Sequence, residues 1–220
     1  MEYTFREKLK TLVILIKEPR ILSKLLSLRL SGFLIDIGWF SAFKTGEPVD
    51  GSFKPLPWLT YSFIDFIEER LSKEFNVFEF GSGNSTLYFA KRVKQVTSLE
   101  HNSEWYNKLK SKIPNSSNLI LSKSDGMEDY ITELKQSNKN YDIIIIDGIY
   151  RNECCFIATN FLTDEGVIIL DDSKRNDYAK GINHLMNEGF MKIDFSGISP
   201  GMFIRKFTTV FYRTQNCLHI

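Results

Sequence analysis

The sequence is poor in cysteine and has no long hydrophobic run. Its three cysteines, Cys154, Cys155 and Cys217, form neither an even disulfide framework nor a CxxC zinc spacing. We therefore expect a reducing, cytoplasmic setting. Near the N-terminus the longest uncharged apolar runs, residues 11–16 and 30–35, are far shorter than the roughly 20 residues that span a bilayer. The sequence predicts neither a transmembrane helix nor a secretory signal.

An excess of charge of one sign is also missing. The 220 residues include 28 Lys or Arg and 27 Asp or Glu, a formal net charge of +1. A protein that clamps many phosphates has a cationic excess, so we expect no nucleic-acid partner. Hydrophobic residues make up 43% of the chain, which is ample for a buried core and excludes a disordered chain.

From residue 75 onward, short runs rich in β-branched and aromatic residues alternate with helix-compatible segments. The strand-like runs are 75–80, 95–100, 118–122, 141–146 and 166–170, and the helix-like segments are 85–93, 103–113, 127–135, 152–162 and 177–187. This alternation predicts βαβ units in a doubly wound, Rossmann-like α/β fold with a mostly parallel sheet. The runs 190–196 and 207–213 are joined by a loop without helical pattern, which predicts a C-terminal antiparallel hairpin. Residues 75–220 would form one domain.

Residues 1–74 form a helical extension that precedes this domain. Residues 1–31 carry seven Lys or Arg and three Glu, a local net charge of +4. Apolar residues at helical spacing in 9–16, and again in 21–28 after Pro19, predict two amphipathic helices. The pattern favours packing on the core or on a second subunit, as in a homo-oligomer, over weak docking to an anionic membrane surface.

Aromatic and turn-forming residues link these helices to the domain. Trp39, Phe40 and Phe43 precede the turn-rich segment 53–58, and residues 61–71 predict a helix directly before the first strand. Aromatic residues in such a link are usual in core packing. The link could also fold over a bound ligand as a lid.

A glycine-rich turn follows the first strand-like run. Residues 77–86 read VFEFGSGNST, and Gly81 and Gly83 allow a tight turn and the close approach of a ligand to the backbone. A GxG pattern alone also occurs in purely structural turns. Glu100 ends the second run, 19 positions after Gly81, where a carboxylate can accept hydrogen bonds from both hydroxyls of a ribose.

Glu79 lies inside the first strand-like run, two residues before the loop. A carboxylate buried there is costly unless a cationic or hydrogen-bond-donating group meets it. A cationic amino-acid ligand would supply that partner. Glu100 therefore suits an adenosine ligand, and Glu79 suits a cationic amino-acid ligand.

These residues resemble the nucleotide-binding loop of the class I S-adenosylmethionine-dependent methyltransferases, and the resemblance covers residues 75–220. It implies that the loop and Glu79 hold the methionine part of the cofactor and that Glu100 holds the ribose. An Asp after the third strand would meet the adenine amine, and His101 could pack against the adenosine. Ser85 stands where the family often has a glycine, but it can cap the following helix. The implied cofactor residues are Glu79, Gly81, Ser82, Gly83, Ser85, Thr86, Glu100, His101, Asp125 and Gly126.

Three further carboxylates follow the two most apolar strand-like runs. Asp147 comes after the run 141–146, and Asp171 and Asp172 come after 166–170. Because open parallel sheets bind ligands beyond the carboxyl ends of their strands, we expect these side chains on one rim, where a hard cation such as Mg²⁺ would relieve their repulsion. Helix capping and loop hydrogen bonds explain the same residues equally well.

The order of these acids is similar to that in the metal-dependent, catechol-type O-methyltransferases. That resemblance implies a metal held by Asp147, Asp171 and Asp172 that would orient the acceptor hydroxyl and lower its pKa. The usual base of that family, a Lys three residues after the first Asp, is replaced here by Tyr150. The base is therefore unassigned. Arg151 cannot act as a base, but it could bind an anionic or polyhydroxyl substrate.

Taken together, the sequence predicts a methyltransferase that moves a methyl group from S-adenosylmethionine to a hydroxyl of a small molecule, with Asp147 and Arg151 as its catalytic residues. Residues 189–201 and 208–212 also resemble methyltransferase-like proteins associated with glycan biosynthesis, which implies a saccharide acceptor. Two alternatives stay open. The chain could be a nicotinamide (NAD) enzyme, although the terminal hairpin disfavours this, or a catalytically silent scaffold that binds an adenosine nucleotide or a membrane.

Overall fold

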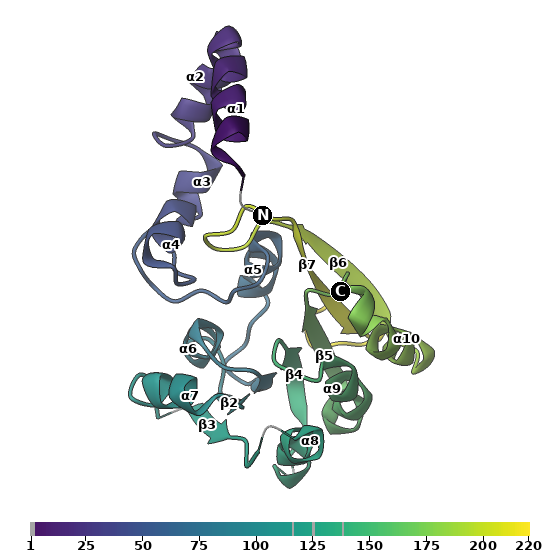
Figure 1. The fold of residues 1–220 in the computed structure, drawn as a ribbon. Helices are drawn as coiled ribbons and strands as arrows, with labels where there is room; N and C mark the ends of the chain where they lie inside the picture. The colour runs from purple at the N-terminus through teal and green to yellow at the C-terminus, as the bar shows by residue number, and fades with distance from the viewer. Residues whose placement is uncertain (1–2, 116, 125, 138) are drawn as a thin grey trace.

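The computed structural model describes residues 3–115, 117–124, 126–137 and 139–220. The described residues form one sheet of seven strands in the order β3-β2-β1-β4-β5-β7-β6 (Figure 1). The strands are β1 (Asn76–Phe80), β2 (Gln95–Glu100), β3 (Ser117–Leu121), β4 (Tyr141–Ile146), β5 (Leu162–Asp171), β6 (Met191–Gly197) and β7 (Lys206–Tyr212). The first five strands are parallel to one another, and β7 is antiparallel to both β5 and β6. The predicted fold class, including the C-terminal hairpin, is confirmed.

Helices precede the sheet and connect its parallel strands. They are α1 (Phe5–Lys17), α2 (Pro19–Ser27), α3 (Phe33–Asp36), α4 (Trp39–Thr45), α5 (Tyr61–Glu68), α6 (Asn84–Ala90), α7 (Ser103–Lys110), α8 (Met127–Gln136), α9 (Arg151–Ala158) and α10 (Ala179–Asn187), with short 3₁₀ turns at Thr159–Phe161 and Asn176–Tyr178. None of the helices in the described part of the chain has the length and apolar character that crossing a membrane requires.

The sheet separates two apolar layers, because successive side chains of a strand point to opposite faces. In β4, for example, Ile143 and Ile145 pack with α5 and α6, whereas Ile144 and Ile146 pack with α8, α9 and α10. All four isoleucines are at most 1% exposed. This is why β4 reads as an unbroken apolar run: both of its faces are covered by helices.

The segment that leads into the first strand belongs to one of these layers. Trp39, Leu59 and the apolar side of α5 are buried in the same cluster as β1 and β4. The indole N–H of Trp39 donates to the Met202 carbonyl at 3.0 Å, which ties α4 to the loop between β6 and β7. The aromatic link is therefore part of the folded body.

The first two helices do not follow this pattern. Neither α1 nor α2 has a buried residue, and Figure 1 shows the pair projecting away from the sheet. The described part of α1 and α2 therefore does not cover the core, and this half of the expectation is wrong; packing on a second subunit stays a prediction. Local signals still specify them: Thr4 and Glu7 form a capping box at the start of α1, and Pro19 begins α2.

The burial contrast gives a first prediction. Leu99, in β2, is fully buried, whereas Leu30 is 81% exposed. We expect Leu99→Ala to lower the free energy of unfolding by about 2–5 kcal/mol, because it leaves a cavity in the packed layer. Leu30→Ala, the matched control, should change it by less than about 0.5 kcal/mol. Urea unfolding followed by circular dichroism measures both, and equal effects would contradict the layer assignment.

Candidate functional site

The strand order reverses between β1 and β4, and the loops after these two strands meet closely. Gly81 has a φ of +102°, and a Cβ added to it would lie 3.3 Å from the Asp147 carbonyl carbon. A Cβ on Gly148 would lie 3.0 Å from the Gly81 nitrogen. Both positions therefore require glycine. A reversal of strand order is also where open α/β sheets form their binding crevice.

Two adjoining pockets lie at this point. One, of about 120 Å³, is lined by Glu79, Gly81, Ser82, Ser85, Glu100, His101, Asp147 and Gly148. The other, of about 100 Å³, is lined by Gly46, Glu47, Pro48, Trp58, Ser82, Gly83, Asn84, Ser85, Trp105 and Asp147. Because they share Ser82, Ser85 and Asp147, we treat them as one cavity, the switch-point cleft. It brings together eight of the predicted site residues from three strand ends.

Glu79 is the most deeply buried acid of the cleft, at 1% exposure. Its Oε2 accepts hydrogen bonds from Thr86 Oγ1 at 2.6 Å and from Ser98 Oγ at 2.8 Å. Burial raises the pKa of Glu79; hydrogen bonds from Ser85, Thr86 and Ser98 oppose the rise, and the charge of Glu100 adds to it. These donors are neutral hydroxyls, so the negative charge of Glu79 is solvated without being neutralised.

Glu100, at the end of β2, is held by the chain itself. One carboxylate oxygen accepts from the backbone N–H groups of His101 and Asn102 at 3.0 and 2.9 Å, and the other accepts from Ser82 Oγ at 2.7 Å. His101 Nδ1 lies 3.2 Å from the first oxygen. The backbone bonds fix the direction of the carboxylate, whereas the Ser82 hydroxyl is a mobile donor that a ligand hydroxyl could replace.

Asp147 faces both parts of the cleft but is paired with Arg151. Arg151 Nη2 lies 2.9 Å from Asp147 Oδ1, and the guanidinium also donates to the carbonyls of Gly148, Asp147 and Asp171. Burial and the charge of Asp171 raise the pKa of Asp147, and Arg151 opposes that rise. Arg151 therefore ties the loop after β4 to the end of β5, and its contacts favour positioning over direct binding of a substrate.

The other two rim acids also have cationic partners. Lys206, the first residue of β7, lies 2.6 Å from Asp171 Oδ2 and 3.5 Å from Asp172 Oδ1, and Arg175 lies 2.5 Å from Asp172. Burial lowers the pKa of Lys206, but the charge of Asp171, its hydrogen bond with Lys206 and the charges of Asp147 and Asp172 together outweigh burial and raise that pKa. The described residues contain no cluster of three His, Cys, Asp or Glu that suits a metal ion. The structure therefore does not support the Mg²⁺ site predicted at Asp147, Asp171 and Asp172, because Lys and Arg side chains already relieve their repulsion.

Sequence reasoning missed the residues that close the cleft from outside the glycine loop. Trp105, in α7, donates its indole N–H to the Ser82 carbonyl at 2.9 Å. Trp58 donates to the Pro200 carbonyl at 2.9 Å, and the Pro48 carbonyl accepts from Asn84 of the glycine loop at 2.8 Å. These contacts come from segments far apart in the sequence. The only earlier signal was the aromatic link that contains Trp58.

The predicted adenine contact, Asp125, lies outside the described residues. Gly126 is exposed at the start of α8, donates its N–H to Ser124 Oγ at 3.0 Å and does not line the cleft. Thr86 does not line the cleft either; it acts through its hydrogen bond to Glu79. The cofactor roles of these three residues stay predictions.

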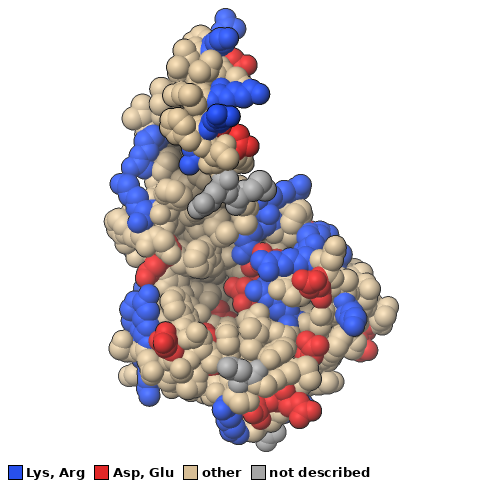
Figure 2. All heavy atoms as spheres, viewed as in Figure 1, with Lys and Arg blue, Asp and Glu red and all other residues tan. Residues whose placement is uncertain are grey.

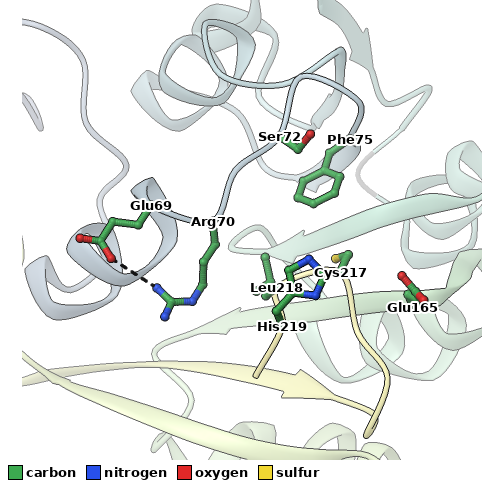
Figure 3. A pocket seen from close by; sticks show the side chains of 8 residues that line it. All are labelled: Glu69, Arg70, Ser72, Phe75, Glu165, Cys217, Leu218 and His219. Atoms are coloured by element: carbon green, nitrogen blue, oxygen red, sulfur yellow. Dashed lines mark ion pairs between the residues drawn. The ribbon is translucent and has the colours of Figure 1, made fainter.

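The molecule also has a larger pocket beside the amino end of β1, whereas the switch-point cleft lies at the carboxyl ends of the strands. It measures about 470 Å³ and is lined by Glu69, Arg70, Ser72, Phe75, Glu165, Cys217, Leu218 and His219 (Figure 3). Phe75 precedes β1, so this pocket lies by the amino end of that strand, whereas the binding crevice of an open parallel sheet is at the carboxyl ends. Burial also raises the pKa of the Cys217 thiol to about 12, which makes it a poor nucleophile at neutral pH. We therefore do not place the active site there.

No protein-family model and no curated protein match the chain. Among solved structures, it is similar to a precorrin-6y C5,15-methyltransferase from Geobacter metallireducens GS-15, with 16% identity over 70% of this chain and 87% of that chain and a TM-score of 0.54. It is similar to a precorrin 8w decarboxylase from Methanobacterium thermoautotrophicum, with 16% identity, coverage of 70% and 89% and a TM-score of 0.52. For a spermidine synthase from Thermotoga maritima, the identity is 12%, the coverage is 70% of this chain and 56% of that chain, and the TM-score is 0.51.

The names of these three proteins include a methyltransferase, a decarboxylase and a synthase, so a shared architecture does not by itself fix the reaction. None of the three is named as a catechol-type enzyme, and that narrower resemblance gains no support. What the likeness shows is the architecture: the chain has the Rossmann-like fold that class I S-adenosylmethionine-dependent methyltransferases use.

Proposed function

We propose that the chain binds S-adenosylmethionine in the switch-point cleft and transfers its methyl group to a hydroxyl of a small, uncharged molecule, a saccharide above all. The observation that carries this proposal is the lining of the cleft, where Glu79, Glu100 and Asp147 converge beside the close approach of Gly81 and Gly148. The fold gives the proposal its context, and the charges in the cleft give it its chemistry.

The fit to the cofactor begins with Glu79. Its carboxylate is buried, its pKa is raised by that burial, and its hydrogen-bond partners are hydroxyl groups. A ligand with a positive charge would complement it and lower that pKa again. S-adenosylmethionine carries two such charges, an α-ammonium and a sulfonium, so we assign Glu79, with Gly81, Ser82, Gly83 and Ser85, to its methionine part.

Glu100 suits the ribose. Its carboxylate is fixed by two backbone N–H groups, and its second oxygen accepts from the Ser82 hydroxyl. Ser82 thus occupies a hydrogen-bonding position that a ribose hydroxyl would take, and the exchange of one hydroxyl for another keeps the carboxylate solvated. His101 lines the same pocket and would pack beside the adenosine. Asp125 and Gly126 stay the proposed adenine contacts.

When bound, S-adenosylmethionine supplies an electrophilic methyl group. The chain supplies position and a proton acceptor: Asp147 lines both parts of the cleft, and its side chain is 29% exposed toward them. Its raised pKa makes it a stronger base than an ordinary carboxylate. We propose that Asp147 accepts the hydroxyl proton of the acceptor and that Arg151 holds Asp147 in place.

The outer part of the cleft suggests the class of acceptor. Its described lining includes two tryptophans, Trp58 and Trp105, and the acids Glu47 and Asp147, but no Lys or Arg. Both acids are ion-paired, Glu47 with Lys108 at 3.6 Å and Asp147 with Arg151 at 2.9 Å, so the lining itself offers no cation to a phosphate-bearing acceptor, nucleic acids included. Aromatic faces and carboxylates together suit a polyhydroxyl ring, which offers apolar C–H groups and hydroxyl donors. The proposal does not include Mg²⁺, because the three rim carboxylates already pair with Arg151, Lys206 and Arg175.

Cofactor binding is tested by titration calorimetry with S-adenosylhomocysteine. We expect the wild type to bind it and Glu100→Ala to bind at least about tenfold more weakly, because hydrogen bonds to a charged group are lost. Glu104→Ala, at an exposed position in α7, should bind like the wild type. A folded wild-type protein that binds NAD instead, or neither compound, would overturn the proposal.

The buried charge of Glu79 predicts how stability depends on pH. Burial raises its pKa above the ordinary value of about 4.5, so the folded state holds this proton over a pH range in which the unfolded state has lost it. The contribution of Glu79 to the free energy of unfolding therefore falls as pH rises above about 4.5, by at most about 1.4 kcal/mol per pH unit. Glu79→Gln removes this contribution, so the stability of this variant should rise relative to wild type as pH increases.

Urea unfolding between pH 5 and 8 measures the difference in stability between the variant and the wild type. Glu74→Gln, at an exposed position, should keep a constant offset from the wild type, and a constant offset for Glu79→Gln would contradict the buried charge.

The transfer step is tested by screening sugars and hydroxylated metabolites with a labelled methyl donor. On an acceptor found in this way, we expect Asp147→Asn to lower kcat by about 100-fold or more, the range of a lost general base, with the affinity for S-adenosylhomocysteine retained. Asp177→Asn, at an exposed position, is the control and should be as active as wild type, and a chelator should not change the rate. Cofactor binding without transfer to any hydroxyl would favour the silent scaffold.

A further inference from the structure

The first two helices form a structure of their own, the N-terminal hairpin (residues 5–27). Neither helix contains a buried residue. Within the hairpin only Leu15, Leu22 and Ser27 are even half-buried, which marks the narrow line along which the helices touch. Figure 1 shows the hairpin at one end of the molecule, far from the glycine loop that precedes α6. The rest of its apolar surface is left without a partner in the described chain.

That apolar surface is ordered along α1. At 100° per residue, one arc of about 100° holds a set of side chains that we call the apolar face of α1. Its members are Phe5 (79% exposed), Leu9 (50%), Leu12 (50%), Val13 (47%) and Ile16 (61%). In α2, Ile21, Leu25 and Leu26 are also 46–64% exposed. Apolar surface of this extent that is exposed on a folded chain marks a site of contact.

Basic residues border the apolar face of α1. The same helical spacing places Arg6, Lys10 and Lys17 along one edge and Lys8 along the other. Glu7, the acid within the helix, lies on the far side and is engaged in the capping box. Figure 2 shows Lys and Arg side chains along the projecting hairpin, with uncharged surface and some acidic side chains between them. An apolar stripe with cationic borders suits the boundary between acyl chains and anionic headgroups.

Charge decides between a lipid surface and a second copy of this chain. Residues 1–31 have a net charge of +4, and a second hairpin would bring the same charge to the contact, which is unfavourable. An anionic bilayer brings the opposite charge, together with an apolar layer. The 13 residues of α1 are too few to cross the bilayer but enough to lie in its interface. We propose that the N-terminal hairpin docks the protein on anionic membranes, with the apolar face of α1 turned toward the acyl chains.

The test is co-sedimentation of the full chain with vesicles of phosphatidylcholine, alone or mixed with phosphatidylglycerol. We expect binding to the anionic vesicles, weaker binding as salt rises, and little binding to phosphatidylcholine alone. Replacing Lys8 and Lys10 by Gln should lower the partition coefficient about fivefold for each charge removed. Binding that ignores both lipid charge and salt would overturn the proposal.

A matched pair of isoleucines separates the apolar face from the stability of the helix. Ile16 belongs to the apolar face, whereas Ile14, also exposed at 46%, lies on the opposite side of α1. Ile16→Gln should reduce vesicle binding by about tenfold or more, and Ile14→Gln should leave it nearly unchanged. Equal losses would overturn the proposal.

Light scattering in the absence of lipid tests the competing occupant. A dimer that Ile16→Gln dissociates, with no binding of the wild type to vesicles, would assign the face to a second copy instead. Affinity for S-adenosylhomocysteine should be the same in all these variants, so the outcome is independent of the proposed function.

Discussion

The constraint on which the cleft depends is a carboxyl group, that of Glu79, which the sheet buries without a cationic partner among the described residues. Glu79 points from β1 into the crevice, and its hydroxyl donors, Thr86 and Ser98, come from α6 and β2. Placing those donors requires β1, β2 and α6 in their observed arrangement, and the close passage of Gly81 past Asp147 sets the position of the loop between them. The fold therefore holds an unbalanced carboxylate at a ligand-sized opening, and a cationic ligand would restore the balance.

The carboxylates of the rim fall into two groups on either side of the strand reversal. On the β1 and β2 side, hydroxyl and backbone N–H groups hold Glu79 and Glu100, with His101 beside Glu100. On the β4 and β5 side, Arg151 and Lys206 pair with Asp147 and Asp171. The first group is free to meet a cationic ligand, and the second is preorganised to hold one carboxylate in a fixed place. This division explains why acids that the sequence groups together do not form a metal site.

Most of the fold and about half of the residues that line the cleft could be predicted from the sequence. The central strands were predictable because burial on both faces demands unbroken apolar runs. The place of residues 77–86 and of Glu100 in the cleft was predictable because their spacing follows from one β-α-β connection. The role of Lys206 was not predictable, because its pairing with Asp171 depends on the register in which β7 joins β5. Trp105 and Trp58 reach the cleft from α7 and from the aromatic link. No local sequence pattern predicts which distant segments the fold brings to the cleft. The sequence predicted the two helices of the N-terminal hairpin but not that they leave the core uncovered, because an amphipathic pattern specifies an apolar face and not what covers it.

The aromatic link connects the two ends of the molecule. It passes from the base of the projecting hairpin through α4, whose Trp39 is anchored to Met202, to Pro48 and Trp58 at the outer wall of the cleft. Trp58 is held in turn by Pro200, and its own carbonyl accepts from Lys206, the partner of Asp171. The outer wall is therefore held by the loop between β6 and β7, through Pro200, and by Lys206, which also neutralises Asp171 on the rim. A displacement of the link would expose Asp147 and would also break the contacts of Trp58 with Pro200 and Lys206. The shape of the acceptor side and the charges around the proposed base therefore depend on the same contacts.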